Sequence, residues 1–274
     1  MKKMMSAVLL CAVSVSYAGF DEGMAAYKKG NYAVALKEFK QAAKQGDASA
    51  QFGLGNMYYE GEGVPQSYKQ AVAWYTKSAE QGYSAAQFSL GLAYDNGEGV
   101  PQNYKQAVEW YTKAAKQGHA SAQYNLGVMY TDGRGVPQDD AQAFVWYTKA
   151  AEQGFASAQS NLGVMYADGR GVTQDDSQAV VWYKKAAEQG HASAQYNLGV
   201  MYAKGEGVPQ NDKIAYILFN IAASKGNDNA VRGRDMVLNI LTPAERADAQ
   251  RISTRLYNAK NFATDLRKLL NGQK

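Results

Sequence analysis

Cysteine, histidine and proline are scarce in this chain. Its 274 residues include one cysteine, two histidines and five prolines. A single cysteine leaves no internal disulfide to stabilise the fold. The formal net charge is only +4, and two of the positive charges, Lys2 and Lys3, belong to an expected export signal. The rest of the chain is therefore nearly neutral, which argues against nucleic acid or an acidic membrane surface as its partner.

The N-terminal 18 residues have the pattern of a secretory signal peptide. A basic start at residues 2–3 precedes an apolar stretch, residues 4–15, that is too short to span a bilayer in the mature chain. Small residues predict cleavage after Ala18. A lipoprotein would use Cys11 as its lipidated residue, but Leu10 is bulky where such signals have a small one. No second apolar run is long enough for a membrane helix, so we expect a periplasmic or secreted protein.

A 36-residue period runs through most of the chain. A tryptophan–tyrosine pair, a leucine–glycine pair and a single glycine all recur at this spacing. The tryptophans are Trp74, Trp110, Trp146 and Trp182. Five units follow one another without insertion or deletion: 47–82, 83–118, 119–154, 155–190 and 191–226. Such a period indicates a repeat protein in which each unit buries its apolar face against its neighbours.

Each unit is predicted to be a helix, a glycine-containing loop and a second helix, which makes the fold class all-α. In the unit 119–154, apolar residues on one helix face run from Ala122 to Tyr130, and Gly133 is placed to end that helix. The second helix is predicted to bury Trp146 and Tyr147 together. It begins after a polar N-cap in every unit. The N-cap residues are Ser67, Asn103, Asp139, Asp175 and Asn211.

The two ends of the array depart from the repeat. Residues 19–46 form a leading hairpin without the glycine-rich loop, and they match the pattern of a tetratricopeptide repeat. Residues 227–274 are predicted to be C-terminal capping helices. Within them, Thr242 and Glu245 form a capping box with proline at the first helical position. Apolar residues after this box are expected to fold back over the last repeat.

The repeated motif A-x-A-Q-x-x-L-G-x-x-Y, followed by G-x-G-V and A-x-x-W-Y-x-K-A-A-x-Q-G, closely resembles the Sel-one-like repeat family. The full motif covers residues 47–226. The resemblance implies a right-handed α/α solenoid of helix-loop-helix repeats that acts as an adaptor in protein complexes. For an exported bacterial member it also implies a link to the cell envelope or to host-cell contact. Some relatives carry a cysteine pair in each repeat and are described as penicillin-binding or β-lactamase-like. This chain lacks those cysteines.

The sequence offers no catalytic, cofactor or metal site. A serine β-lactamase needs a lysine three residues after its nucleophile, and no serine of this chain has one. His119 and His191 lie two repeats apart, roughly 20 Å or more in a stacked array, so they cannot share a metal ion. We interpret them as polar residues at a hairpin junction. The recurring G-x-G follows a helix and lacks the lysine of a phosphate-binding loop, so we interpret it as a helix stop.

The predicted binding surface is the face of the first helices that points away from the core. In a stacked array these helices line the concave side. Aromatic and amide side chains stand in neighbouring columns there, which suits an extended peptide. The residues predicted to bind are Phe52, Phe88, Tyr124, Asn125, Val128, Asn161, Tyr196 and Asn197. The alternative is that the aromatic rings only help neighbouring helices pack.

These observations favour an exported scaffold or adaptor that binds a protein or peptide, and the family resemblance links such a protein to envelope assembly or host-cell contact. The mature chain is expected to have no stable membrane insertion and no nucleic-acid partner. An alternative of a different class is a cell-wall-related hydrolase, or a penicillin-binding or β-lactamase-like protein, which rests on family association alone. A third is a structural spacer without a specific ligand.

Overall fold

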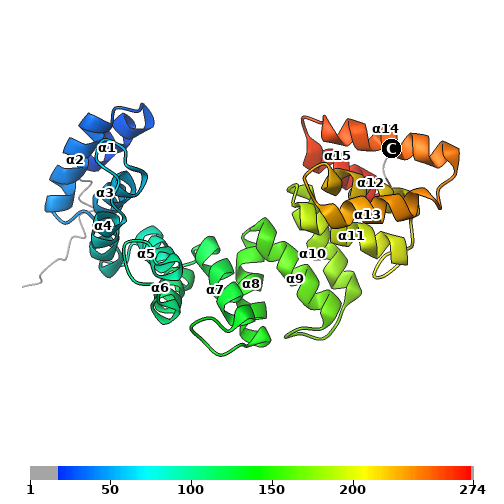
Figure 1. The fold of residues 1–274 in the computed structure, drawn as a ribbon, viewed down its shortest axis with the longest axis horizontal. Helices are drawn as coiled ribbons and strands as arrows, with labels where there is room; N and C mark the ends of the chain where they lie inside the picture. Colours follow the sequence, from blue (N-terminus) through cyan, green and yellow to red (C-terminus); the bar gives the residue numbers. More distant parts are fainter. Residues whose placement is uncertain (1–17, 273–274) are drawn as a thin grey trace, which may run out of the picture. The chain divides into compact units, whose positions relative to one another are not determined.

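The computed structural model describes residues 18–272, and all regular secondary structure in this range is helical. The predicted signal peptide lies outside the described residues, except for Ala18, with which the first helix begins. The helices are α1 (Ala18–Lys28), α2 (Tyr32–Lys44), α3 (Ala48–Glu60), α4 (Tyr68–Glu80), α5 (Ser84–Asn96), α6 (Tyr104–Lys116), α7 (Ala120–Asp132), α8 (Asp140–Glu152), α9 (Ala156–Asp168), α10 (Asp176–Glu188), α11 (Ala192–Lys204), α12 (Asp212–Ala223), α13 (Asp228–Leu238), α14 (Pro243–Tyr257) and α15 (Phe262–Leu270) (Figure 1). Between residues 18 and 272, no helix combines the length and apolar character needed to cross a membrane.

Consecutive helices pack on one another from α1 to α4 and from α6 to α13. Helices α7 and α8 form one hairpin, α9 and α10 the next, and α8 contacts α9 between them (Figure 1). The chain forms two compact units. The first runs to Leu90 and includes 98–101, and the second takes 91–97 and the chain from Gln102 onward. The predicted all-α fold of repeated helix pairs stacked in a solenoid is confirmed.

Local polar bonds set where the helices of each hairpin begin and end. The Asp139 carboxylate accepts a hydrogen bond from the Gln142 backbone N–H at 2.9 Å. The other four predicted N-caps make the same bond, which satisfies an otherwise unpaired donor at each helix start. At the end of α7, Gly133 adopts the left-handed conformation with φ 67°, as predicted for a helix stop.

The second glycine of each G-x-G loop touches the preceding hairpin. Gly135 has φ 73°, and a Cβ atom built on it would lie 2.4 Å from the backbone oxygen of Tyr104. Only glycine permits that approach. The residue between the two glycines is therefore held against the previous repeat, and its side chain is placed where two repeats meet.

A tyrosine packed directly on a glycine forms the centre of each repeat. Tyr147 of α8 is 3 % exposed, and a Cβ on Gly127 of α7 would lie 2.6 Å from its ring. The equivalent pairs are Gly55 with Tyr75, Gly91 with Tyr111, Gly163 with Tyr183 and Gly199 with Phe219. The glycine of the leucine–glycine pair is therefore needed because the ring lies on the backbone of the first helix.

The tryptophans lie at the edge of the core, so the prediction that they are buried with the tyrosines is wrong. Each of the four is only half-buried. The ammonium group of the lysine three residues later lies over each indole, 3.8 to 4.4 Å from the ring centroid. Neighbouring positions on a helix point about 100° apart, so the tyrosine takes the core position and the tryptophan a flanking one. The lysine then covers the outer face of the ring.

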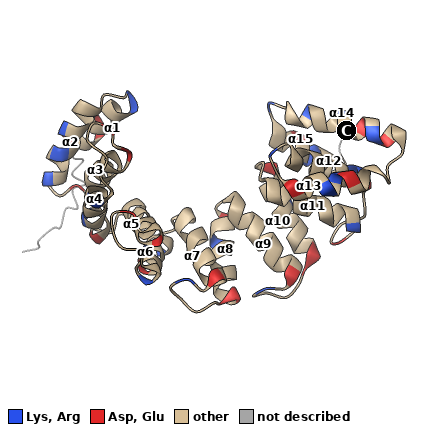
Figure 2. Cartoon of the chain, in the orientation of Figure 1, with Lys and Arg blue, Asp and Glu red and all other residues tan. Residues whose placement is uncertain are grey.

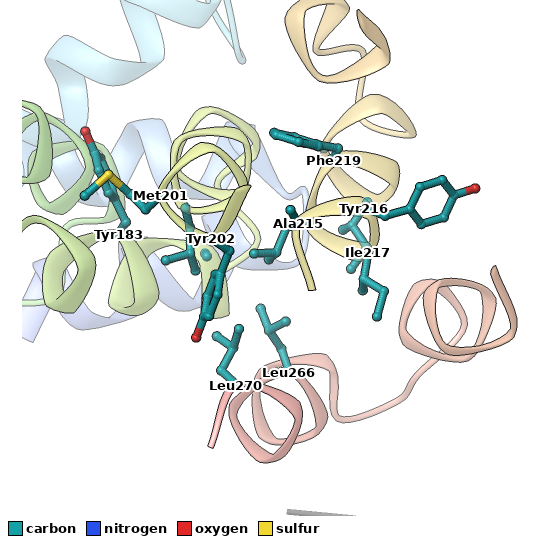
Figure 3. Packing of buried hydrophobic residues seen from close by; sticks show 14 of the residues in the cluster. Tyr183, Met201, Tyr202, Ala215, Tyr216, Ile217, Phe219, Leu266 and Leu270 are labelled. Atoms are coloured by element: carbon teal, nitrogen blue, oxygen red, sulfur yellow. The ribbon is translucent and has the colours of Figure 1, made fainter. Parts of the chain in front are cut away.

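The C-terminal segment forms three helices, α13, α14 and α15. The predicted capping box is present, with reciprocal bonds between Thr242 and Glu245 at the start of α14. Helix α14 packs on α12, and α15 packs on α10 and α14. Leu266 and Leu270 of α15 are buried and point toward Tyr202 of α11 (Figure 3). These contacts cover the apolar surface that the last repeat would otherwise expose.

Candidate functional site

The residue inside four of the five G-x-G loops bonds a side chain of the preceding hairpin, whereas Glu206 pairs with Lys204 of its own hairpin. In the first unit, the carboxylate of Glu62 accepts a hydrogen bond from the Tyr32 hydroxyl at 2.7 Å. In the second compact unit, Arg134 Nη1 lies 3.2 Å from Asp95 Oδ1. The five residues of this loop column are Glu62, Glu98, Arg134, Arg170 and Glu206. The charge of the column thus changes sign along a repeated backbone, and both signs occur at the loops after α7 and α9 (Figure 2).

The hydroxyl groups of the core tyrosines emerge beside this column. The Tyr111 hydroxyl donates to Asp95 Oδ2 at 3.2 Å, and the Tyr147 hydroxyl lies 3.3 Å from that of Thr131. Burial raises the pKa of both tyrosines, so each hydroxyl keeps its proton at neutral pH. The first four repeats therefore present a polar group on the first-helix side of an otherwise apolar core, while the fifth has Phe219 there.

The predicted asparagines lie against these hydroxyl groups. Asn125 donates to the oxygen of Tyr111, and Asn197 donates to the oxygen of Tyr183. Asn161 donates to Tyr147 in the same way and also bonds Tyr124. Each asparagine comes from the first helix of one repeat and each core tyrosine from the second helix of the repeat before it. The amides therefore join neighbouring repeats as well as lining their surface.

The predicted aromatic residues are half-buried and pack against the core tyrosines. The ring centroid of Tyr124 lies 5.8 Å from that of Tyr147 and 5.0 Å from that of Phe155. Phe52 packs in the same way on Tyr75 and Tyr83, at 5.7 and 5.4 Å. Tyr196 lies 5.7 Å from Phe219, while Phe88 and Val128 are likewise half-buried. These side chains do help hold the hairpins together, and their contact with a partner stays a prediction.

Two cavities recur at equivalent places in the second unit. The first, about 130 Å³, is lined by Thr131, Tyr147, Asn161, Val164, Met165 and Arg170. The second, about 340 Å³, uses the residues 36 positions later: Ala167, Tyr183, Asn197, Val200, Met201 and Glu206. Asp168, Gln174, Asp176 and Lys204 also line the second cavity. Asn161 and Asn197 are the predicted site residues that lie in these cavities.

The charged residues of these cavities were missed by sequence reasoning. Arg170 lies outside the first helices and bonds Asp140 from 30 positions away, with Nη2–Oδ1 at 2.7 Å. The signal was the middle residue of the G-x-G motif, which changes sign from repeat to repeat. A helix stop accounts for the two glycines of that motif but not for the residue between them.

The two histidines act as helix N-caps, which agrees with their interpretation as junction residues. His119 Nδ1 accepts a hydrogen bond from the Ala122 backbone N–H at 3.3 Å, and His191 bonds Ala194 at the same distance. Burial is the main cause that lowers the pKa of both. Within residues 18–272, no group of three or more histidine, cysteine or acidic residues is placed to hold a metal ion.

Comparison with known proteins identifies the repeat. The Sel1 repeat family model matches residues 48–83, 84–119, 120–155, 156–191 and 192–227. A Sel1 repeat protein from Oxalobacter formigenes is 36% identical, with 79% of this chain and 86% of that chain covered and a TM-score of 0.74. A putative Sel1 repeat protein from Klebsiella pneumoniae is 27% identical, with 73% and 97% covered and a TM-score of 0.45. None of the curated proteins compared with this chain matches it.

Proposed function

The chain belongs to the Sel1 repeat family, whose solenoid fold is typically a protein–protein interaction scaffold, and we propose that this member is an exported adaptor for a protein or peptide. We place its binding surface on the first-helix side, at the cavities and loop residues where successive repeats meet. The observation that carries the proposal is the loop column, which reads Glu, Glu, Arg, Arg, Glu on an otherwise repeated frame.

A changing set of charges on a constant frame is what selective recognition requires. The core residues explain the fold in every repeat alike, so they give no repeat a separate preference. Arg134 and Arg170 offer donors where Glu62, Glu98 and Glu206 offer acceptors. A partner that contacts several of these loops would meet glutamate at some and arginine at others, which favours one sequence of groups over others.

Site-specific photocrosslinking tests this surface. The photoreactive residue p-benzoylphenylalanine is placed at Ser121 of α7, in cells that express the full chain. Ser121 lies on the same helix face as the predicted binding residues Tyr124 and Asn125, one turn before them. The matched control places it at Val145 of α8, which is 42 % exposed. We expect a discrete crosslinked partner from position 121 and none from position 145. Crosslinks from 145 alone would move the interface to the second helices, and none from either would count against an adaptor.

We also propose that the chain is exported, on the strength of its first 18 residues. The basic start, the short apolar stretch and the small residues before Gly19 support cleavage after Ala18. Fractionation of expressing cells, followed by N-terminal sequencing, tests this directly. We expect a protein beginning at Gly19 in the periplasm or medium. An uncleaved chain confined to the cytoplasm would contradict export, and with it a role in envelope assembly or host-cell contact.

We propose that the adaptor is not a cell-wall hydrolase or a β-lactamase. The family is typically non-enzymatic, and no serine of this chain is followed by lysine at the third position. The purified protein is expected to leave a chromogenic β-lactam and purified peptidoglycan intact. Turnover of either substrate that survives repeated purification would restore the enzymatic alternative.

A further inference from the structure

The larger of the two cavities differs from the smaller one at two positions that matter for its chemistry. Arg170 in the smaller cavity corresponds to Glu206 in the larger, and Thr131 corresponds to Ala167. Valine, methionine, asparagine and tyrosine are shared by the two linings. The larger cavity is therefore a copy of the smaller one from which a guanidinium group and a hydroxyl group have been removed.

The missing guanidinium has a defined place. One repeat earlier, Arg170 binds Asp140 through two hydrogen bonds, Nη2–Oδ1 at 2.7 Å and Nε–Oδ2 at 3.2 Å. Asp176 is the equivalent of Asp140 and is half-buried. Its described hydrogen bond is a long one from the Gln174 side chain, at 3.4 Å. Among residues 18–272, no arginine or lysine forms an ion pair with Asp176 or with Asp168 beside it.

The missing hydroxyl leaves a buried donor facing the same cavity. Tyr183 is 3 % exposed and lines the cavity. Asn197 donates to its oxygen, as in the other repeats. Its proton has no acceptor within residues 18–272, because Ala167 stands where Asp95 and Thr131 pair with the equivalent tyrosines. The Tyr183 ring is buried, but its hydroxyl opens onto the cavity, so a ligand bound there can supply the acceptor that the chain does not.

We propose that this cavity binds an arginine residue of a partner polypeptide, with its guanidinium on Asp176 and Glu206 and a main-chain carbonyl accepting from Tyr183. The inference rests on the proposed function and names the chemistry of the partner at one place. Lys204 pairs with Glu206, with Nζ 3.4 Å from Oε1, whereas Asp168 and Asp176 have no ion-pair partner within residues 18–272. The three carboxylates outnumber the single ammonium, so the charge of the cavity favours a cation. Planar, bidentate bonding to a carboxylate is what distinguishes arginine from lysine here, as Arg170 shows one repeat earlier.

Nuclear magnetic resonance with a doubly blocked amino acid tests the site without needing the partner. N-acetyl-arginine methylamide carries both the guanidinium and the carbonyl groups that the cavity requires. Titrated into the purified protein, it should shift the Asn197 side-chain amide signal to saturation. N-acetyl-norleucine methylamide, which lacks the charge, should not. No saturable shift with the arginine compound, or equal shifts with both, would overturn the proposal.

Charge variants locate the effect. Glu206→Arg places a guanidinium of the chain itself in the cavity, as Arg170 does one repeat earlier. It should weaken binding of N-acetyl-arginine methylamide at least about tenfold. The loop already accepts arginine at positions 134 and 170, so this variant is expected to fold. Asp176→Asn should weaken binding in the same way, and Tyr183→Phe by less. Glu152→Arg makes the same change of charge on an exposed residue at the end of α8 and should bind like the unmodified chain. Equal binding by Glu206→Arg and Glu152→Arg would contradict the assignment.

The opposite exchange should create a second site. Arg170→Glu removes the internal guanidinium and leaves Asp140 unpaired, so the blocked arginine should then also shift the Asn161 amide. Crosslinking at position 121 separates this inference from the proposed function. A crosslinked partner without arginine binding would remove only the arginine site. Arginine binding without any crosslinked partner would leave a cation site and overturn the adaptor.

Discussion

At the scale of single residues, the glycine of each leucine–glycine pair sets how closely two helices approach. A Cβ on Gly127 would lie 2.6 Å from the Tyr147 ring. Overpacking of this kind costs about 1–3 kcal/mol, while alanine gains about 0.5–1 kcal/mol of helix propensity over glycine. We therefore expect Gly127→Ala to lower the free energy of unfolding by about 1–2 kcal/mol in urea titrations. In a Tyr147→Leu background the same change should be neutral or stabilising. A similar cost in both backgrounds would show that the ring is not the cause.

The two residues of the repeated tryptophan–tyrosine pair have different structural roles. Tyr147 is buried, whereas Trp146 is half-buried beneath Lys149. Tyr147→Ala should destabilise by about 3–5 kcal/mol, as large aromatic deletions in cores do, and Trp146→Ala by roughly half as much. Denaturation of the two variants side by side measures the difference. A larger loss of unfolding free energy for Trp146→Ala than for Tyr147→Ala would contradict the placement of the tryptophans at the edge of the core.

The two histidine N-caps predict a pH dependence of stability. Burial disfavours the charged ring and lowers the pKa of both histidines in the folded state, and each neutral ring accepts the cap hydrogen bond through Nδ1. The unfolded chain then binds protons more readily than the folded one. The contribution is complete above about pH 6.5 and is lost as the pH falls through the lowered pKa of the folded state.

Melting temperatures measured at pH values between about 7.5 and 5 test this dependence. The matched control is His119→Asn with His191→Asn, because asparagine caps a helix without titrating in this range. The unmodified chain should lose more of its melting temperature on acidification than the double variant. Parallel losses in the two proteins would assign the effect to other groups.

At the scale of helices, buried glutamines link successive hairpins. Gln159 Nε2 donates to the Ala151 backbone oxygen at 3.0 Å, and its Oε1 accepts from Gln189 at 2.7 Å. Gln195 repeats the first bond, to Ala187, at 3.1 Å. Within residues 18–272 its Oε1 has no partner, because Lys225 takes the position equivalent to Gln189 and donates to the Gly190 backbone oxygen at 2.7 Å instead. The last repeat therefore lacks the bond that corresponds to the one between Gln189 and Gln159.

This difference gives a matched pair of variants. Gln159→Leu removes two hydrogen bonds and strands the Gln189 amide, whereas Gln195→Leu removes one bond and an unpaired buried oxygen. We expect Gln159→Leu to cost about 1–2 kcal/mol more than Gln195→Leu. Equilibrium unfolding of both variants provides the comparison. Equal losses would mean that the bond between Gln159 and Gln189 contributes nothing to the stability of the α9–α10 hairpin.

The period of the sequence predicted the helices and their ends because those depend on residues close together in the chain. Asp139 caps a helix three residues away, and Gly133 ends the helix next to it. The paired charges were not predicted, since Arg170 and Asp140 meet only when two hairpins stack. The half-buried state of Tyr124 has the same origin, because its ring rests on the hairpin's own Tyr147 and on Phe155 beyond it. Helical periodicity places a residue on a face but does not say how deeply the neighbouring helix covers it.

At the scale of the whole molecule, the ends of the array are not equivalent to its middle. Removing residues 120–155 joins His119 to Ala156 and deletes one period. The remaining contacts have counterparts, since Asn161 can meet Tyr111 as Asn125 does, and His119 can cap α9, whose own N-cap Phe155 makes no side-chain bond. Such an array is stabilised mainly by contacts between neighbouring repeats. We expect the shortened chain to fold with the same helicity per residue and a modestly lower melting temperature.

Removing residues 243–274 should do more damage, although it deletes fewer residues. Helices α14 and α15 bury five apolar side chains in the cluster that includes the last repeats: Ala249, Ile252, Leu256, Leu266 and Leu270. Terminal repeats need such a cover because an exposed apolar face favours association. Circular dichroism melts and size-exclusion chromatography of the two deletions decide the matter. We expect the repeat deletion to stay monodisperse and the cap deletion to aggregate or melt at a lower temperature. The reverse order would mean that stability depends on the central repeats as a single cooperative block, with the C-terminal helices serving another purpose.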